Sequence, residues 1–185
     1  MQQKKKLTTR EVTQRIIPVF REAGYDGASL EALAAAAGLT RGTLYHHFPK
    51  GKAQMADAVL TRAGTALTQH ILTPLRSGGD TVTIINSMLD GVLKYYGGDP
   101  PVCLMNALTL GEGRVLFGAK VEAAVNAWHK MIVDVLVRGG ISKKEANCEA
   151  IDLLASIQGA LILSRVAGSR RVFEDAIGRL QQRPR

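Results

Sequence analysis

The stretch from Ser29 to Phe48 constrains the fold more than any other part of the chain. It reads SLEALAAAAGLTRGTLYHHF. Ser29 and Thr40 are residue types that cap the start of a helix, and Gly38 is typical of a helix end. Two short helices are therefore expected, with about three residues between them. Such a pair, joined by a tight turn that contains glycine, is a helix-turn-helix.

The rest of the chain also favours helices, so we expect an all-α protein. Thr8 and Glu11 have the spacing of a capping box, and Ser142 and Glu145 repeat it. No run of alternating apolar and polar residues bounded by hairpin turns predicts a strand. About nine helices are expected, over residues 8–24, 29–38, 40–48, 52–72, 80–96, a short one ending near 110, 113–138, 142–167 and a last one that bears Phe173, Ala176, Ile177 and Leu180.

The composition points to a folded, basic protein. Apolar residues make up 46% of 185, enough for a substantial core. Residues 1–52 carry nine Lys/Arg against four Asp/Glu, whereas residues 53–185 carry fifteen against twelve. A basic first quarter favours a polyanionic partner. No unbroken apolar run reaches the roughly 18 residues of a membrane span, and MQQKKKLTTREV lacks the pattern of a secretory signal. We expect a cytoplasmic protein with no membrane partner.

The second helix of a helix-turn-helix enters the major groove of DNA with its first residues. Here those residues are Thr40, Arg41, Gly42 and Thr43. The fork of Arg41 can pair with guanine O6 and N7, and Thr43 can offer its methyl group to thymine. The amide or hydroxyl of Thr40 can meet a phosphate. Glycine costs about 1 kcal/mol relative to alanine inside a helix, so Gly42 indicates a close approach to DNA.

Some of the residues that follow are expected to contact DNA, and others are expected to pack in the core. Tyr45 and His46 are expected at the sugar-phosphate backbone. Lys52, near the start of the next helix, is expected to hold a phosphate together with the helix dipole. Leu44 and Phe48 lie four apart and are predicted to face the core.

The sequence predicts neither a metal site nor an enzyme. His46 and His47 are adjacent and point about 100° apart on a helix, so they do not share a metal readily. Cys103 and Cys148 form no CxxC pair and are expected to be free, buried thiols. No nucleophile elbow, phosphate loop, HExxH motif or carboxylate pair is present, so no catalytic residue or cofactor is predicted.

The segment GYDGASLEALAAAAGLTRGTLYHHFPKGKAQMADAVL resembles the N-terminal domain of TetR/AcrR-type transcriptional regulators. The resemblance covers roughly residues 9–60, and the variant FPKGK is similar to the LmrA/YxaF-like subgroup. It implies about nine helices, a homodimer on a palindromic DNA operator, and a repressor released by a small molecule. The DNA contacts that it implies are Ser29, Thr40, Arg41, Gly42, Thr43, Tyr45, His46 and Lys52.

The chain is longer than a DNA-binding module requires, so we divide it into residues 1–52, the DNA-binding domain, and residues 53–185, a helical bundle for ligand binding and dimerisation. Methionine adapts to irregular ligands and tryptophan offers a flat face. Met88 and Trp128 also fit ordinary core packing, and that alternative stays open. The candidate ligand-binding residues are Met88, Tyr95, Cys103, Met105, Trp128, His129 and Gln158.

The last two helices are expected to form the dimer interface, as the resemblance implies. The helix over 142–167 carries small residues that permit close approach, among them Ala155 and Gly159. The last helix adds Phe173, Ile177 and Leu180. The leading hypothesis is a dimeric repressor that responds to a small, apolar or aromatic ligand. The alternative is a DNA-organising or adaptor protein that senses no small molecule.

Overall fold

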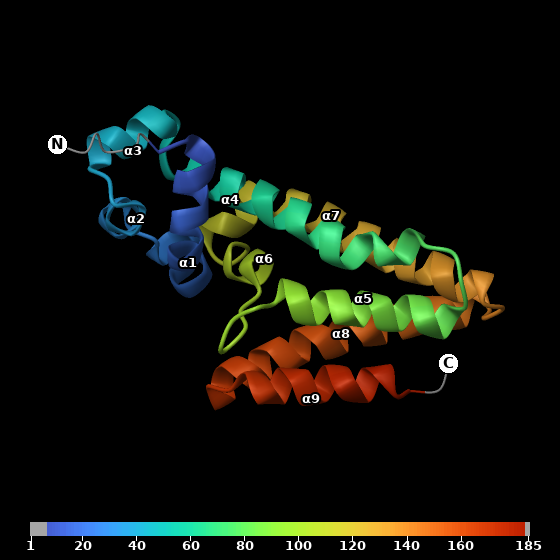
Figure 1. Cartoon of the computed structure of the whole chain (residues 1–185). Coiled ribbons are helices and arrows are strands. Elements are labelled where there is room, and N and C mark those ends of the chain that lie inside the picture. Colours follow the sequence, from blue (N-terminus) through green and yellow to red (C-terminus); the bar gives the residue numbers. More distant parts are fainter. Residues whose placement is uncertain (1–6, 184–185) are drawn as a thin grey trace. The chain divides into compact units, whose positions relative to one another are not determined.

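The computed structural model describes residues 7–183, which form nine α-helices and no strand (Figure 1). The predicted all-α fold is confirmed. Lysines 4–6 of the basic N-terminus lie outside the described residues. The elements are α1 (Thr9–Gly27), α2 (Leu30–Ala37), α3 (Arg41–His47), α4 (Gly51–Leu67), a π-helical turn η1 (Thr68–Leu72), a 3-10 turn η2 (Pro74–Arg76), α5 (Thr81–Tyr95), α6 (Leu104–Ala107), α7 (Glu112–Arg138), α8 (Lys143–Ala167) and α9 (Arg170–Gln181).

The chain forms two compact units whose division differs from the predicted one at residue 52. Among the described residues, the first unit contains residues 7–63 and 104–119, and the second contains residues 64–103 and 120–183. The first half of α4 belongs with the helix-turn-helix because Met55, Ala56 and Val59 are buried. Residues 104–119 join the first unit because the amide of Glu112 donates to Asp26 Oδ2 at 3.2 Å. The functional roles assigned to the two segments remain predictions.

In the first unit, α1 begins with the predicted capping box. The amide of Glu11 donates to Thr8 Oγ1 at 3.2 Å, and the amide of Thr8 donates to Glu11 Oε2 at 2.8 Å. Helical dihedrals are interrupted at Gly24, which has a φ of 68°, and not at Pro18 inside the same helix. A Cβ on Gly24 would lie 2.8 Å from the carbonyl oxygen of Ala107. The core side chains of α1 are Val12, Ile16 and Phe20.

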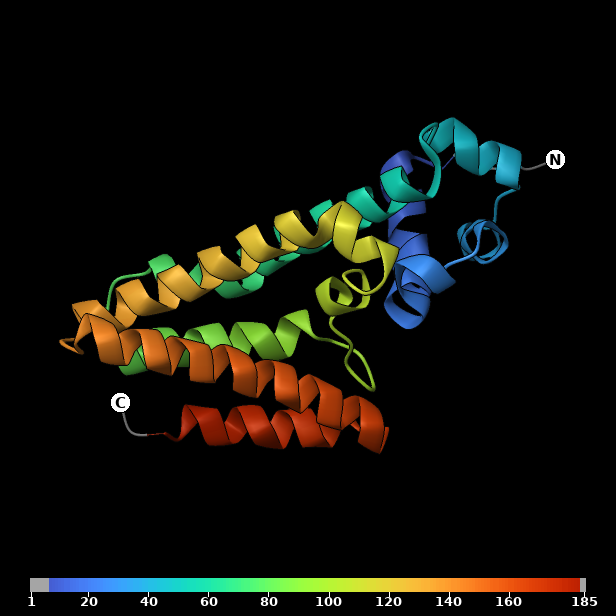
Figure 2. The ribbon, with the colours of Figure 1, turned by 180° about the vertical axis from the view of Figure 1, so that it is seen from behind.

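In the second unit, α8 and α9 lie side by side and run in opposite directions (Figures 1 and 2). Helix α5 packs against α9 and against η1 and η2. Phe173, Ile177 and Leu180 of α9 are buried within this unit. They are therefore not available to a partner, contrary to the predicted interface, because the apolar face of this amphipathic helix is used by its own bundle.

Helix α8 is apolar on two faces. One face is buried, with Leu153, Ile157 and Leu161 among its residues, and the opposite face leaves Ile162 and Val166 exposed. Within residues 7–183, α8 is the one helix long and apolar enough to cross a membrane by length and composition. The buried face of α8 packs against α9, as expected for a helix in a protein bundle.

Candidate nucleic-acid interface

The turn between α2 and α3 has the geometry that the sequence predicted. Gly38 ends α2 in the left-handed region, with φ 68° and ψ 34°. The amide of Leu39 donates to the carbonyl of Ala34 at 3.0 Å, which closes the end of α2. Arg15 of α1 donates from Nη1 to the carbonyl of Ala37 at 2.9 Å. The orientation of α2 is therefore fixed by the neighbouring helix as well as by the turn.

Helix α3 starts on a pair of threonines. The amide of Thr43 donates to Thr40 Oγ1 at 3.2 Å, and the two hydroxyls share a hydrogen bond of 2.9 Å. Leu44 and Phe48 are fully buried, as predicted, and hold the inner side of the helix. This anchoring leaves the first turn of α3 on the surface, with Arg41 exposed.

Arg41 has an acidic partner that the sequence reasoning missed. Its Nη1 lies 2.7 Å from Glu31 Oε1, in the first turn of α2. Both side chains remain largely exposed. A carboxylate in the first turn of a helix is common, because the helix dipole favours it. The position of Glu31 in the sequence therefore did not indicate an ion pair with Arg41.

Gly42 has no neighbour in the structure that demands a glycine. A Cβ built on it meets only Thr40 Oγ1, at 4.0 Å, which is ordinary contact. Its helical dihedrals are those of any residue. The predicted close approach of DNA to Gly42 remains a prediction, and packing within the chain offers no competing reason for the residue.

The adjacent histidines have different surroundings. His47 Nδ1 shares a hydrogen bond of 3.1 Å with Thr9 Oγ1 and is half-buried, whereas His46 is exposed. The partly exposed ring of Tyr45 lies over Gly51, with Cε1 3.6 Å from the position of a built Cβ. In the part of the chain that is described, no three His, Cys, Asp or Glu residues are grouped so as to hold a metal.

Lys52 in the first turn of α4 is held by the end of α1. Its Nζ lies 4.5 Å from the centroid of the Tyr25 ring and 3.5 Å from the carbonyl oxygen of Asp26. Tyr25 in turn meets Phe117 edge to face, with ring centroids 5.5 Å apart. Burial raises the pKa of Tyr25, and the charges of Glu112 and Asp26 raise it further. Tyr25 therefore stays a neutral ring beneath the ammonium.

The predicted ligand-binding residues of the second unit fall into two buried groups. In one, Trp128 Nε1 donates to Met88 Sδ at 3.3 Å. In the other, the hydroxyl of Tyr96 lies 3.7 Å from Cys103 Sγ. Burial raises the pKa of Tyr96 well above its ordinary value, and Cys103 adds to the rise, whereas a hydrogen bond with Gln158 opposes it. The tyrosine that meets Cys103 and Gln158 is thus Tyr96, which the sequence reasoning passed over.

The remaining ligand-binding candidates are more scattered. Tyr95 is half-buried and packs its ring against Tyr96 at 4.7 Å, and Met105 belongs to the first unit. His129 is half-buried, and its Nε2 is buried without a hydrogen-bond partner, as is Oδ1 of Asn86. A groove of about 740 Å³ in the second unit is lined by none of the predicted residues but by Leu75, Arg76, Met131, Val133, Asp134, Val137, Arg138 and Lys143.

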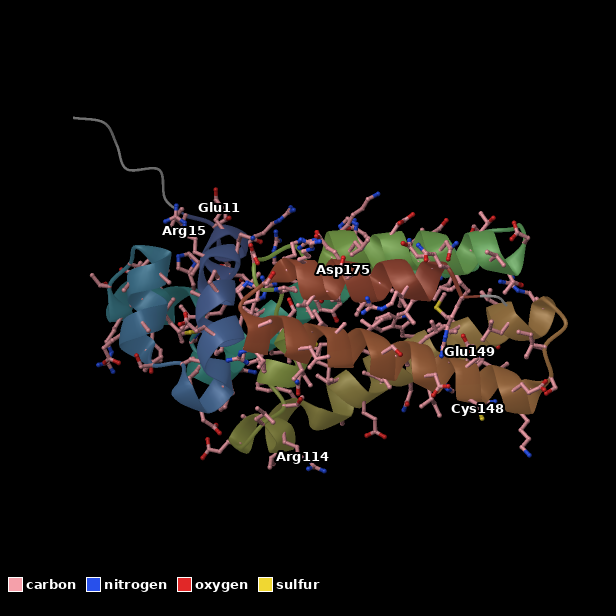
Figure 3. All side chains as sticks on the ribbon, turned by 90° about the horizontal axis from the view of Figure 1, so that it is seen from below. Glu11, Arg15, Arg114, Cys148, Glu149 and Asp175 are labelled. Atoms are coloured by element: carbon pink, nitrogen blue, oxygen red, sulfur yellow. The ribbon has the colours of Figure 1, made fainter. Side chains whose placement is uncertain are left out.

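Cys148 differs from the prediction of a buried thiol. Cys103 is buried, but Cys148 is exposed on α8. Figure 3 shows it at the outer edge of that helix. Both cysteines are free, as predicted.

The described residues thus contain a helix-turn-helix whose second helix, α3, is exposed in its first turn, in a chain that is otherwise helical. These features are typical of a DNA-binding regulator. Residues 17–59 match the model of bacterial regulatory proteins of the tetR family. Residues 99–178 match the C-terminal domain of LmrA/YxaF-like transcriptional regulators. The chain therefore belongs to the TetR family of transcriptional regulators. Proteins of this family are regulators and not enzymes, in agreement with the absence of a predicted catalytic motif.

Related proteins agree over most of the chain. The transcriptional regulator LmrA of Bacillus subtilis is 27% identical over 80% of this chain and 81% of its own. The TetR-family regulator CifR, solved with 26-base-pair operator DNA, has a TM-score of 0.76 and 19% identity over 96% of this chain and 97% of its own. AibR, solved with isovaleryl coenzyme A and operator DNA, has a TM-score of 0.62 and 19% identity over 85% of both chains. These two structures support the fold.

Proposed function

We propose that this protein is a dimeric repressor that binds a palindromic DNA operator and is released by a small molecule. The main support for the proposal is the first turn of α3, in which Arg41 is exposed. Leu44 and Phe48 are buried and hold this helix against the core. Arg41 reads guanine in the major groove, and Thr40 and Thr43 contact the backbone or a thymine methyl group.

The other DNA contacts surround α3. Ser29 caps α2, with Oγ accepting the amide of Ala32 at 3.1 Å, and its exposed side faces a phosphate. His46 and Tyr45 reach the sugar-phosphate backbone. Lys52 binds a phosphate at the start of α4, where the helix dipole adds to its charge. The operator-bound CifR shares this fold.

A second copy of the chain covers the exposed apolar face of α8. At 100° per residue, Ile151, Ile162 and Val166 share that face with the small residues Ala155 and Gly159. The three large residues are all more than half exposed. An added Cβ at Gly159 meets nothing within 4 Å, so the face has room for a close helix crossing. A two-fold dimer presents two α3 helices to two half-sites.

The effector binds inside the second unit, near Trp128 and Tyr96. These side chains offer aromatic faces, and Met88 and Cys103 add soft apolar surface. Buried polar atoms normally have a partner. Oδ1 of Asn86 and Nε2 of His129 lack one, so a polar group on an otherwise apolar or aromatic ligand supplies it. AibR, which has this fold, was solved with isovaleryl coenzyme A, and this supports a small-molecule site in the proposal.

Release from DNA follows from linkage. An effector weakens operator binding only if it prefers a conformation that binds the operator poorly. Helices α4 and α7 each contribute residues to both compact units, so they are the segments through which the two sites are coupled.

The direct test is to select, from a pool of random DNA duplexes, those that the purified full chain binds at physiological salt concentration. We expect enrichment of a palindrome whose half-sites are about 10 base pairs apart, centre to centre. Recovery of no common sequence would contradict sequence-specific binding. Recovery of a single, unpaired half-site would contradict the dimer.

A second experiment separates induction from the DNA-organising alternative. Apolar and aromatic compounds that raise the melting temperature are tested for release of the selected operator. A repressor of the proposed kind loses operator affinity with at least one such compound. Compounds that stabilise the protein and leave operator affinity unchanged would favour the alternative.

A further inference from the structure

A carboxylate lies on the surface that we propose for DNA. Glu31 is the second residue of α2, two positions after the cap Ser29, and Arg41 is the first residue of α3. Arg41 Nη1 and Glu31 Oε1 are 2.7 Å apart, so an ion pair joins the first turns of the two helices. The side chains are 58% and 66% exposed, which leaves the pair accessible from solvent.

Stability of the free protein is a weak reason for this pair. Exposed ion pairs contribute little to folding, because water screens them and ordering two long side chains costs entropy. The helix dipole favours Glu31 at the start of α2 but disfavours Arg41 at the start of α3. On DNA, a carboxylate among phosphates is repelled. Glu31 therefore weakens DNA binding electrostatically. It can favour a specific operator only if it hinders the binding of Arg41 to a phosphate more than the binding of Arg41 to a base.

The geometry provides such a difference. A guanidinium carries five N–H donors, and Glu31 engages Nη1, which leaves the edge formed by Nη2 and Nε for guanine O6 and N7. A guanine edge is neutral and can be bound while the carboxylate stays in place. A phosphate carries the same charge as Glu31, so the two compete for Arg41.

We propose that Glu31 is a specificity-determining residue, whose ion pair with Arg41 holds the guanidinium for base readout and penalises binding through phosphate alone. This rests on the proposed function, because it needs a sequence-specific operator. Glu31 acts through Arg41 and is a positioning residue. Its removal is expected to strengthen binding to random DNA more than binding to the operator.

The test compares Glu31→Gln with Glu22→Gln, which removes the same charge from an exposed residue of α1. Affinities are measured by fluorescence anisotropy for the selected operator duplex and for a random-sequence duplex of equal length. We expect Glu31→Gln to lower the operator-to-random selectivity about fivefold, as for one surface charge, and Glu22→Gln to leave it unchanged. Glu31→Ala, which also removes the hydrogen bond, should lower it at least as much. Melting temperatures of all variants confirm folding.

A double-mutant cycle with Arg41→Ala assigns the effect to the pair. In the Arg41→Ala protein, Glu31→Gln should no longer change selectivity. Equal shifts by Glu31→Gln and Glu22→Gln, or a Glu31 effect that persists without Arg41, would overturn the inference. A wild-type protein that does not distinguish the selected operator from random DNA would instead overturn the proposed function, and the inference with it.

Discussion

Arg170 and Arg171 are neighbours at the start of α9 with very different surroundings. The guanidinium of Arg170 donates to one backbone carbonyl in the last turn of α5 and to two just after that helix, and the amide of Arg170 donates to Asp99 Oδ1 at 2.8 Å. Arg171 is 86% exposed and lies 3.8 Å from Asp175. Arg170 therefore fastens α9 to the end of α5. The carbonyls that it binds belong to Leu93, Tyr96 and Gly98.

Arg170→Ala is expected to lower the free energy of unfolding by about 3 kcal/mol, because several charge-assisted hydrogen bonds are lost from a part-buried site. Arg171→Ala should change it by less than about 0.5 kcal/mol. Urea unfolding followed by circular dichroism measures both values. Equal effects of the two variants would show that the Arg170 contacts do not stabilise the bundle.

Lys52 is expected to bind a phosphate and no base. Lys52→Ala should weaken binding to operator DNA and to random DNA by the same factor. It should also reduce the slope of the logarithm of the binding constant against the logarithm of the salt concentration by about 1. Anisotropy titrations over a range of salt concentrations measure the slope. Lys130→Ala is the matched control, since Lys130 pairs with Asp134 at 2.7 Å in the second unit and should leave the slope unchanged. A change in sequence preference would contradict the phosphate role of Lys52.

Among the elements, α5 approaches the backbone of η1 closely at Gly91. A Cβ on Gly91 would overlap the backbone carbonyl of His70, whereas one on Gly178 of α9 meets nothing within 4 Å. Gly91→Ala is expected to destabilise the protein by about 3 kcal/mol, because backbone must move to remove the overlap. Gly178→Ala should be neutral or stabilising by up to about 1 kcal/mol. Thermal and urea unfolding of both variants test the contact, and an unfolding free energy of Gly91→Ala equal to the wild type would contradict it.

The sequence predicted individual helices better than their assembly. Ser29 and Thr40 cap the helices expected of them, because a cap is a local interaction between residues three apart. The grouping of residues 104–119 with the helix-turn-helix depends on contacts between distant segments, such as Asp26 with Glu112, which no local pattern encodes.

The candidate site shows the same limit. Leu44 and Phe48 were predicted as core from their spacing, and the structure agrees. Glu31 and Tyr96 were missed, because their roles depend on the neighbours Arg41 and Cys103 that the fold brings to them. Residue type alone identifies a chemical group but not its partner.

At the scale of the whole molecule, the proposed repressor is a dimer that forms through α8. Light scattering at micromolar concentration should give twice the chain mass of 19.9 kDa. Ile162→Asp places a charge in the proposed interface and should weaken dimerisation by about 3 kcal/mol, roughly 100-fold in Kd. Val82→Asp, an equivalent change at an exposed apolar residue of α5, should leave the mass unchanged. A wild-type monomer, or loss of the dimer in both variants, would contradict the α8 interface.

The most direct test of the central claim is the affinity for the selected operator after insertion of five base pairs between its half-sites. Half a helical turn moves the second half-site to the opposite side of the duplex, so a two-fold dimer no longer reaches both with its α3 helices. We expect the affinity to fall to that of a duplex that carries a single half-site. Affinity unchanged by the five-base-pair insertion would contradict the reading of a palindromic operator by a dimer.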